Sequence, residues 1–329
     1  MQNNKNYNIE LIEPYLDKLS IILDELAESQ VSQASFIARQ LFSAGGKRLR
    51  PALVILSALA ASSNQIDEKK MLMIAAAAEL VHSASLIHDD VVDETKERRG
   101  KPTANAKLGN KLSVLGGDFL LSKAFTILAS QNDPKLMAIL SANATSMAES
   151  EMLQASSEGN LDLWRDNYWR IIEGKTAGFF KVCCGCGAII AKSDSSIYNA
   201  LCDYGLKLGL SFQITDDILD FTNNSKKTGK DSLTDITNGK FTLPLILALD
   251  NIPADKKADL EEILRNNTLN KQEAASVAEI VSLAGGIEAA RNSAKEKAEQ
   301  AIESISILPQ TPYKDALVSL AQSIVVRMH

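Results

Sequence analysis

Apolar residues recur at helical spacing along almost the whole chain of 329 residues. Apolar positions three or four residues apart predict amphipathic or buried α-helices rather than strands. No stretch alternates apolar and polar residues for long enough to predict a sheet. The pattern therefore predicts an all-α protein, with its clearest helices in the segments 9–27, 71–94, 116–130, 134–154 and 198–221.

Polar breaks rich in glycine, lysine or arginine separate these segments, at 43–51, 97–103 and 223–240. Such residues end helices and form turns. The long helices show no composition change at which a second core would begin, and no long Gly, Ser or Pro linker interrupts them. We therefore expect one domain over residues 1–329, a single large helical bundle with a central cavity.

Composition limits the classes of protein and the compartment. Aromatic residues make up 5% of the chain, and the isoelectric point of about 5.3 argues against nucleic acid as a partner. The four cysteines lack the spacing of a zinc site and suggest no disulfide framework, which fits a reducing compartment. The N-terminus lacks the pattern of a signal peptide, and the longest uncharged run, residues 51–66, is too short to span a membrane. We expect a soluble cytoplasmic protein.

A group of carboxylates closes the apolar segment 71–94. Asp89 and Asp93 lie one helical turn apart on one face, with Asp90 beside them. His82 and Ser85 share that face. Stacked carboxylates repel one another unless a cation neutralises them, and oxygen-only ligands suit Mg²⁺. A solvated helix end is the alternative interpretation of such a charge run.

The same arrangement closes the segment 198–221. Asp216 and Asp220 are again one turn apart, with Asp217 between them and Gln213 on the same side. One Asp-Asp-x-x-Asp motif is weak evidence, but two at the ends of long apolar helices indicate a shared purpose. The simplest arrangement has the two helices facing each other across a cavity, with several Mg²⁺ ions between them.

Basic residues accompany these motifs, mostly beside glycines at predicted helix ends. Scattered Lys and Arg are usually surface residues, but backbone N–H groups at such ends also favour anions, and Arg forks match phosphate oxygens. Acidic and basic groups together predict Mg²⁺-bridged polyphosphate. The sequence has no P-loop and few histidines, which favours departure of a diphosphate, leaving a carbocation in a dry apolar cavity. The basic set is Lys47, Arg48, Arg50, Arg98, Arg99, Lys175, Lys230 and Lys240.

The ordered motifs from about residue 45 to residue 246 resemble those of trans-isoprenyl diphosphate synthases, also called polyprenyl synthetases. They are GGKRLRP, LVHSASLIHDDVVDE, RRGKPT, GDFLLSKAF, EGKTAGFF, LGLSFQITDDILDF and NGKFTLPLI. The resemblance implies a homodimeric all-α enzyme that joins isopentenyl diphosphate to an allylic diphosphate, head to tail, with Mg²⁺. Transient association with a membrane for product release is consistent with this activity.

Roles follow from the resemblance, position by position. It implies isopentenyl diphosphate binding by Lys47, Arg50, His82 and Arg99. It implies allylic diphosphate binding by Arg98, Lys175, Thr176, Gln213, Lys230 and Lys240. It implies metal binding by Asp89, Asp90, Asp93, Asp216, Asp217 and Asp220. We expect Asp89, Asp93, Asp216, Lys175 and Lys240 to be the catalytic residues.

The helix before the first motif bears on product length. Ala84 is five positions before Asp89, where short-chain members of the family tend to carry an aromatic residue, and Ser85 is small as well. Small residues there would leave room for a long product, so we predict a long-chain all-trans polyprenyl diphosphate. Close packing between helices is the alternative explanation of the small residues.

The chain departs from the family pattern at some positions, among them the end of the chain, where Met and His follow Arg327. Ser150 stands where the family often has Gly, and Asn238 stands where Glu is common. Three other activities remain as alternatives: a farnesyl or geranylgeranyl diphosphate synthase, a class I terpene cyclase, and a non-catalytic subunit of a two-chain prenyl synthase. Sparse aromatics argue against the cyclase, and the complete set of acidic and basic residues argues against the non-catalytic subunit.

Overall fold

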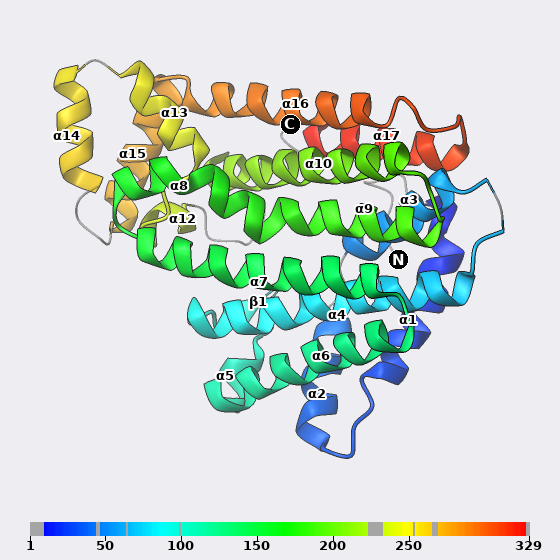
Figure 1. Cartoon of the computed structure of the whole chain (residues 1–329). Helices are drawn as coiled ribbons and strands as arrows, with labels where there is room; N and C mark the ends of the chain where they lie inside the picture. Colours follow the sequence, from blue (N-terminus) through cyan, green and yellow to red (C-terminus); the bar gives the residue numbers. More distant parts are fainter. Residues whose placement is uncertain are drawn as a thin grey trace. The chain divides into compact units, whose positions relative to one another are not determined.

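The computed structural model describes residues 10–43, 47–63, 65–98, 100–222, 233–252, 254–264 and 269–326. Within these ranges the chain is almost entirely helical, and the strands found there are two residues long (Figure 1). The predicted all-α class is confirmed.

The chain forms two compact units, each assembled from three segments. Unit 1 contains residues 1–144, 182–202 and 307–319, and unit 2 contains residues 145–181, 203–306 and 320–329. Four helices contribute residues to both units: α7 (Pro134–Ser157), α9 (Gly178–Ile190), α10 (Ser195–Thr222) and α17 (Pro312–Val326). The single-domain interpretation stays a prediction.

Unit 1 is built around the long helix α4 (Glu68–Val92), which α1, α3, α5 and α6 contact. The Asp67 side chain accepts a hydrogen bond from the Lys70 N–H at 2.9 Å and so caps the start of α4. Apolar residues surround most of this helix, as expected for a core helix. The other elements are η2 (Glu10–Ile12), α1 (Glu13–Leu26), α2 (Ser32–Ser43), α3 (Leu49–Ala61), α5 (Ala104–Leu108) and α6 (Asn110–Ser130).

A small hairpin follows α4. Strands β1 (Glu97–Arg98) and β2 (Lys101–Pro102) pair antiparallel, with Arg98 opposite Lys101. Gly100 has a φ of +73°, a value that a residue with a side chain adopts only with strain. The hairpin occupies the predicted break at 97–103 and brings Arg98 back towards the end of α4.

Unit 2 has its own apolar core. Its central aromatic residues, Trp164, Tyr168 and Phe241, are 3% exposed or less. Helix α13 packs against α15 and α16, and α8 leads directly into the π-helix η3. The elements are α8 (Leu161–Ile172), η3 (Glu173–Ala177), α12 (Thr234–Thr237), α13 (Leu243–Asn251), α14 (Ala254–Leu264), α15 (Lys271–Leu283) and α16 (Gly286–Ser304).

Two described helices, α4 and α6, are long and apolar enough to span a membrane by length and composition alone. Their apolar stretches contain charged residues, unlike the uncharged run at 51–66, so the expectation that no segment spans a membrane stays a prediction. In α4, 72% of the most apolar window is buried, against 39% in α6. A core helix passes the same test, so the finding is weak evidence for a membrane span.

Candidate active site

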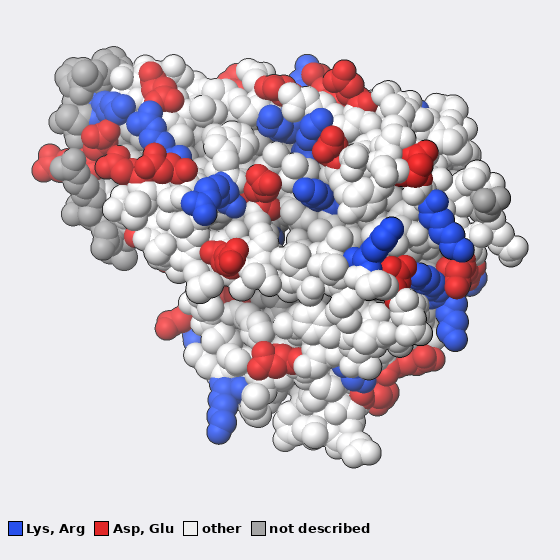
Figure 2. Space-filling model, viewed as in Figure 1, with Lys and Arg blue, Asp and Glu red and all other residues white. Residues whose placement is uncertain are grey.

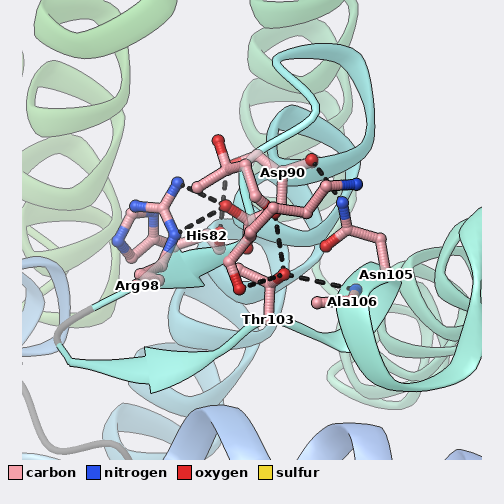
Figure 3. Close-up of polar contacts among 9 residues, drawn as sticks. His82, Asp90, Arg98, Thr103, Asn105 and Ala106 are labelled. Carbon is pink, nitrogen blue, oxygen red and sulfur yellow. Dashed lines mark hydrogen bonds and ion pairs between the residues drawn. The ribbon is translucent and has the colours of Figure 1, made fainter. Parts of the chain in front are cut away.

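The first aspartate motif lies at the C-terminal end of α4. The Asp93 N–H donates to the Asp89 carbonyl at 2.8 Å, which keeps the two residues one turn apart. Asp90 differs from its neighbours because it is buried and faces Arg98 (Figure 3). Arg98 donates from Nε to Asp90 Oδ1 at 2.9 Å, and its Nη2 lies 2.9 Å from the same oxygen. Burial raises the pKa of the Asp90 carboxyl, although Arg98 acts in the opposite direction.

Two polar residues after the hairpin hold the end of α4 in place. The Thr103 hydroxyl donates to the Thr95 carbonyl at 2.8 Å, and the Asn105 amide donates to the Asp90 carbonyl at 2.9 Å. Both side chains are buried (Figure 3). These hydrogen bonds therefore fix both ends of the segment that carries Arg98.

The basic residues near the start of α3 contact the same helix, α4. Arg50 Nη1 lies 3.0 Å from His82 Nε2, so two predicted ligands of isopentenyl diphosphate meet. Arg48 forms an ion pair with Glu79, and its Nη2 donates to the Phe42 carbonyl at 3.1 Å. This pairing gives Arg48 a structural role in unit 1.

In the second motif, Asp217 points into protein. It is 2% exposed, and its two oxygens accept from the Tyr168 hydroxyl at 2.6 Å and the Gln213 amide at 3.0 Å. Burial, with the charges of Asp216 and Asp220, raises the pKa of the Asp217 carboxyl to about 7, while the two hydrogen bonds oppose the rise. Asp216 and Asp220 are half-buried.

Asp220 organises Thr234 and Asp235, which lie within the predicted loop at 223–240. Its carboxylate accepts from the Thr234 hydroxyl at 2.8 Å and from the N–H groups of Thr234 and Asp235, each at 3.1 Å. These bonds begin the short helix α12. Burial and the charges of Asp220 and Asp217 raise the pKa of the Asp235 carboxyl. Asp235 therefore extends the acidic group beyond the predicted motif.

A polar face of α7 holds two predicted allylic-site lysines. Lys175 Nζ lies 2.5 Å from Glu151 Oε1 and donates to Gln154 Oε1 at 3.2 Å. Lys240 Nζ lies 3.9 Å from Oε1 of Glu158, the residue that directly follows α7. Lys175 belongs to η3, and such single π-turns are frequent at functional sites. Both of these unit 2 lysines therefore lie near the C-terminal end of α7.

Close packing places Thr176 next to Gln213. A Cβ atom on Gly209 would lie 2.5 Å from Ala177 Cα, so only glycine lets α10 approach η3 this closely. One turn further along α10, the side-chain oxygen Oε1 of Gln213 accepts from the Thr176 hydroxyl at 2.8 Å. Two residues predicted to bind the allylic diphosphate are therefore brought together.

The carboxylates offer a donor set that fits Mg²⁺. The residues of both motifs supply oxygen donors, and Mg²⁺ usually binds one or two carboxylates together with substrate phosphates and water. Among the described residues, no group of three His, Cys, Asp or Glu side chains could hold a metal ion.

Two predicted basic residues and the arrangement of the two aspartate motifs stay predictions. Arg99 and Lys230 lie outside the described residues. Asp89 and Asp216 belong to different units, so the facing arrangement of the two motifs stays a prediction. Lys47 is half-buried at the entry to α3.

The small residues Ala84 and Ser85, which would line a tunnel for a long product, belong to unit 1. Ala84 is 2% exposed, and the Ser85 hydroxyl donates to the His82 carbonyl at 2.9 Å. Both tunnel lining and close helix packing agree with this burial.

Sequence reasoning missed several polar partners. Glu151 and Gln154 on α7 and Glu158 just after it recur every three or four residues, a spacing that could have revealed one polar face. Tyr168 gave no such signal because it lies on the apolar face of α8 with Trp164 and Ile172.

Comparisons with known proteins identify the family of the chain. The polyprenyl synthetase family model matches residues 32–281. The chain is 37% identical to an octaprenyl diphosphate synthase of Escherichia coli over 93% of both chains. It is 35% identical to an all-trans-nonaprenyl-diphosphate synthase of Rhodobacter capsulatus over 91% of both chains.

Solved structures give the same result. A decaprenyl diphosphate synthase from Rhodobacter capsulatus matches with a TM-score of 0.90 and 32% identity over 97% of this chain and 98% of that one. A polyprenyl synthase from Caulobacter crescentus, complexed with calcium and isoprenyl diphosphate, matches with a TM-score of 0.89 and 34% identity over 96% of both chains. The chain belongs to the polyprenyl synthetase family and is a prenyltransferase.

Proposed function

We propose that this protein condenses isopentenyl diphosphate with an allylic diphosphate, head to tail, and repeats the step to make a long-chain all-trans polyprenyl diphosphate. The observation that carries this proposal is the identity of 37% over 93% of both chains with an octaprenyl diphosphate synthase. Relatives named nonaprenyl and decaprenyl diphosphate synthase, at 35% identity, support the long-chain assignment.

The reaction needs a leaving group and no side-chain nucleophile. The allylic C–O bond breaks, and diphosphate leaves with the electron pair. The alkene electrons of isopentenyl diphosphate then form the new C–C bond, and loss of a proton to the released diphosphate restores a double bond. Bound Mg²⁺ would stabilise the charge that develops on the leaving diphosphate.

The residues divide between the two substrates. Arg50 and His82, which contact each other, are assigned to isopentenyl diphosphate together with Lys47 and Arg99. Lys175, Thr176 and Gln213 are assigned to the allylic diphosphate, with Arg98, Lys230 and Lys240. Asp89, Asp93, Asp216 and Asp220 are the proposed metal ligands. The other two expected ligands, Asp90 and Asp217, are left out because they are buried and hydrogen-bonded to Arg98 and Tyr168. The calcium and isoprenyl diphosphate named for the Caulobacter crescentus structure support a metal-bound diphosphate site.

A homodimer in the cytoplasm completes the proposal. Helix α6 exposes apolar side chains, with Leu115 54% and Val114 39% exposed, and a second copy of the chain would cover them. Acidic and basic side chains are interspersed on the face drawn in Figure 2, which does not favour a nucleic-acid partner. Brief contact with a membrane would release an apolar product.

Metal dependence tests this function. The purified protein is supplied with isopentenyl and geranyl diphosphate, and diphosphate release is measured with Mg²⁺ and with excess EDTA. Chelation should abolish turnover, and Asp89→Ala and Asp216→Ala should lower it by orders of magnitude while circular dichroism stays unchanged. The exposed Asp203 on α10 provides the control variant Asp203→Ala, which should retain activity. Undiminished turnover in EDTA would refute the mechanism.

A further inference from the structure

The Asp217 carboxylate is the best-anchored group in the second motif. It is 2% exposed, and each of its oxygens accepts one hydrogen bond, Oδ2 from Tyr168 at 2.6 Å and Oδ1 from Gln213 at 3.0 Å. The two donors come from α8 and α10. With both oxygens engaged by protein, this carboxylate has a fixed orientation.

The anchoring continues into the predicted allylic site. Gln213 accepts from the Thr176 hydroxyl at 2.8 Å while its amide donates to Asp217. The four side chains form one hydrogen-bonded row: Thr176, Gln213, Asp217 and Tyr168. The row ties η3, α10 and α8 together within unit 2.

Tyr168 is the fixed end of this row. It is 1% exposed and packs in the core of unit 2 with Trp164 and Phe241, which leaves its hydroxyl a single direction. A buried tyrosine normally has a partner for its hydroxyl, and here that partner is a carboxylate between two proposed metal ligands. We propose that Tyr168 is a positioning residue that orients Asp217 and thereby fixes the turn of α10 carrying Asp216 and Asp220.

This inference rests on the proposed function and adds a residue to it. Partners that orient metal-binding groups typically change metal affinity or activity by about 10–100-fold when they are removed. Tyr168→Phe keeps the ring in the core and removes only the hydroxyl. Asp217 would then lose the donor at Oδ2 and could turn towards its neighbouring carboxylates.

The test compares wild type, Tyr168→Phe and Tyr198→Phe. Tyr198 lies on α10, and its hydroxyl is hydrogen-bonded to the Cys202 side chain, so it controls for the loss of a tyrosine hydroxyl. We expect Tyr168→Phe to raise the Mg²⁺ concentration for half-maximal rate about ten-fold and to raise the KM for the allylic diphosphate. The KM for isopentenyl diphosphate should stay unchanged, and Tyr198→Phe should behave as wild type.

Several results would overturn the inference. They are a Mg²⁺ requirement of Tyr168→Phe within two-fold of wild type, an equal rise in both KM values, or the same change in Tyr198→Phe. If Tyr168→Phe loses turnover, thermal unfolding of the variant is measured with and without Mg²⁺ and inorganic diphosphate. A rise in Tm on adding them that equals the rise in wild type would contradict the positioning role of Tyr168. An inactive wild type would instead refute the proposed function.

Discussion

Replacing Gly174 with alanine should disturb the contact between η3 and α7. A Cβ atom there would lie 1.8 Å from Ser150 Oγ and 3.0 Å from Ser150 Cβ. Favourable contacts between carbon atoms lie at about 3.5–4.0 Å, so rotating the hydroxyl away would still leave the two Cβ atoms too close. Such overpacking costs about 1–3 kcal/mol, and the higher helix propensity of alanine offsets up to about 1 kcal/mol.

A second substitution, at Ser150, should restore the stability that Gly174→Ala removes. Ser150→Gly removes both crowding atoms and leaves Ser146 Oγ at 3.1 Å as the next neighbour. We expect Gly174→Ala to lower the free energy of unfolding by about 1–2 kcal/mol, and its cost to vanish in the Ser150→Gly background. The family often has Gly at position 150, so the double variant would carry the small residue on α7 instead of on η3.

Denaturant midpoints of wild type, both single variants and the double variant measure the coupling. Ala148→Gly, at an exposed position on α7, gives the cost of a glycine in this helix without the contact. Because Lys175 and Thr176 follow Gly174 directly, the KM for the allylic diphosphate should rise and recover together with stability. Additive effects within about 0.5 kcal/mol would refute the steric argument.

Three further variants test other parts of the molecule. Burial alone would raise the pKa of the Asp133 carboxyl, but Lys70, 2.9 Å away, lowers it. The ion pair therefore stabilises the folded protein at pH 7, and this stabilisation is lost as the pH falls below about 4. Asp133→Asn should therefore lower the Tm more at pH 7 than at pH 3. Ala84→Phe should shorten the products to farnesyl or geranylgeranyl length while turnover persists; an unchanged chromatogram would favour helix packing. Leu115→Glu should convert the proposed dimer to a monomer in light scattering, and a dimer mass for both proteins would exclude this face of α6.

The sequence predicted the long helices because their signals are local. The apolar segment 71–94 corresponds to α4, which begins at Glu68 because Asp67 caps it. Within the predicted loop at 223–240, the structure shows the short helix α12. Its start depends on the Asp220 carboxylate, fourteen residues earlier, and no local pattern reveals this contact.

The aspartate motifs were visible in the sequence, but the difference between their members was not. Helical spacing places Asp89 and Asp93 on one face, yet it says nothing of the partner that Asp90 finds across the hairpin in Arg98. Asp217 meets Tyr168, 49 positions away in the chain, through the packing of α8 on α10. Contacts of this kind arise from tertiary packing and lie beyond periodicity arguments.

The length of the product tests the central claim most directly. The purified wild-type protein is incubated with Mg²⁺, geranyl diphosphate and an excess of labelled isopentenyl diphosphate, and the dephosphorylated products are separated by chromatography. The account predicts that isopentenyl diphosphate is consumed and that the main product is longer than the geranylgeranyl standard. Products that end at farnesyl or geranylgeranyl length, or no incorporation of label, would contradict it.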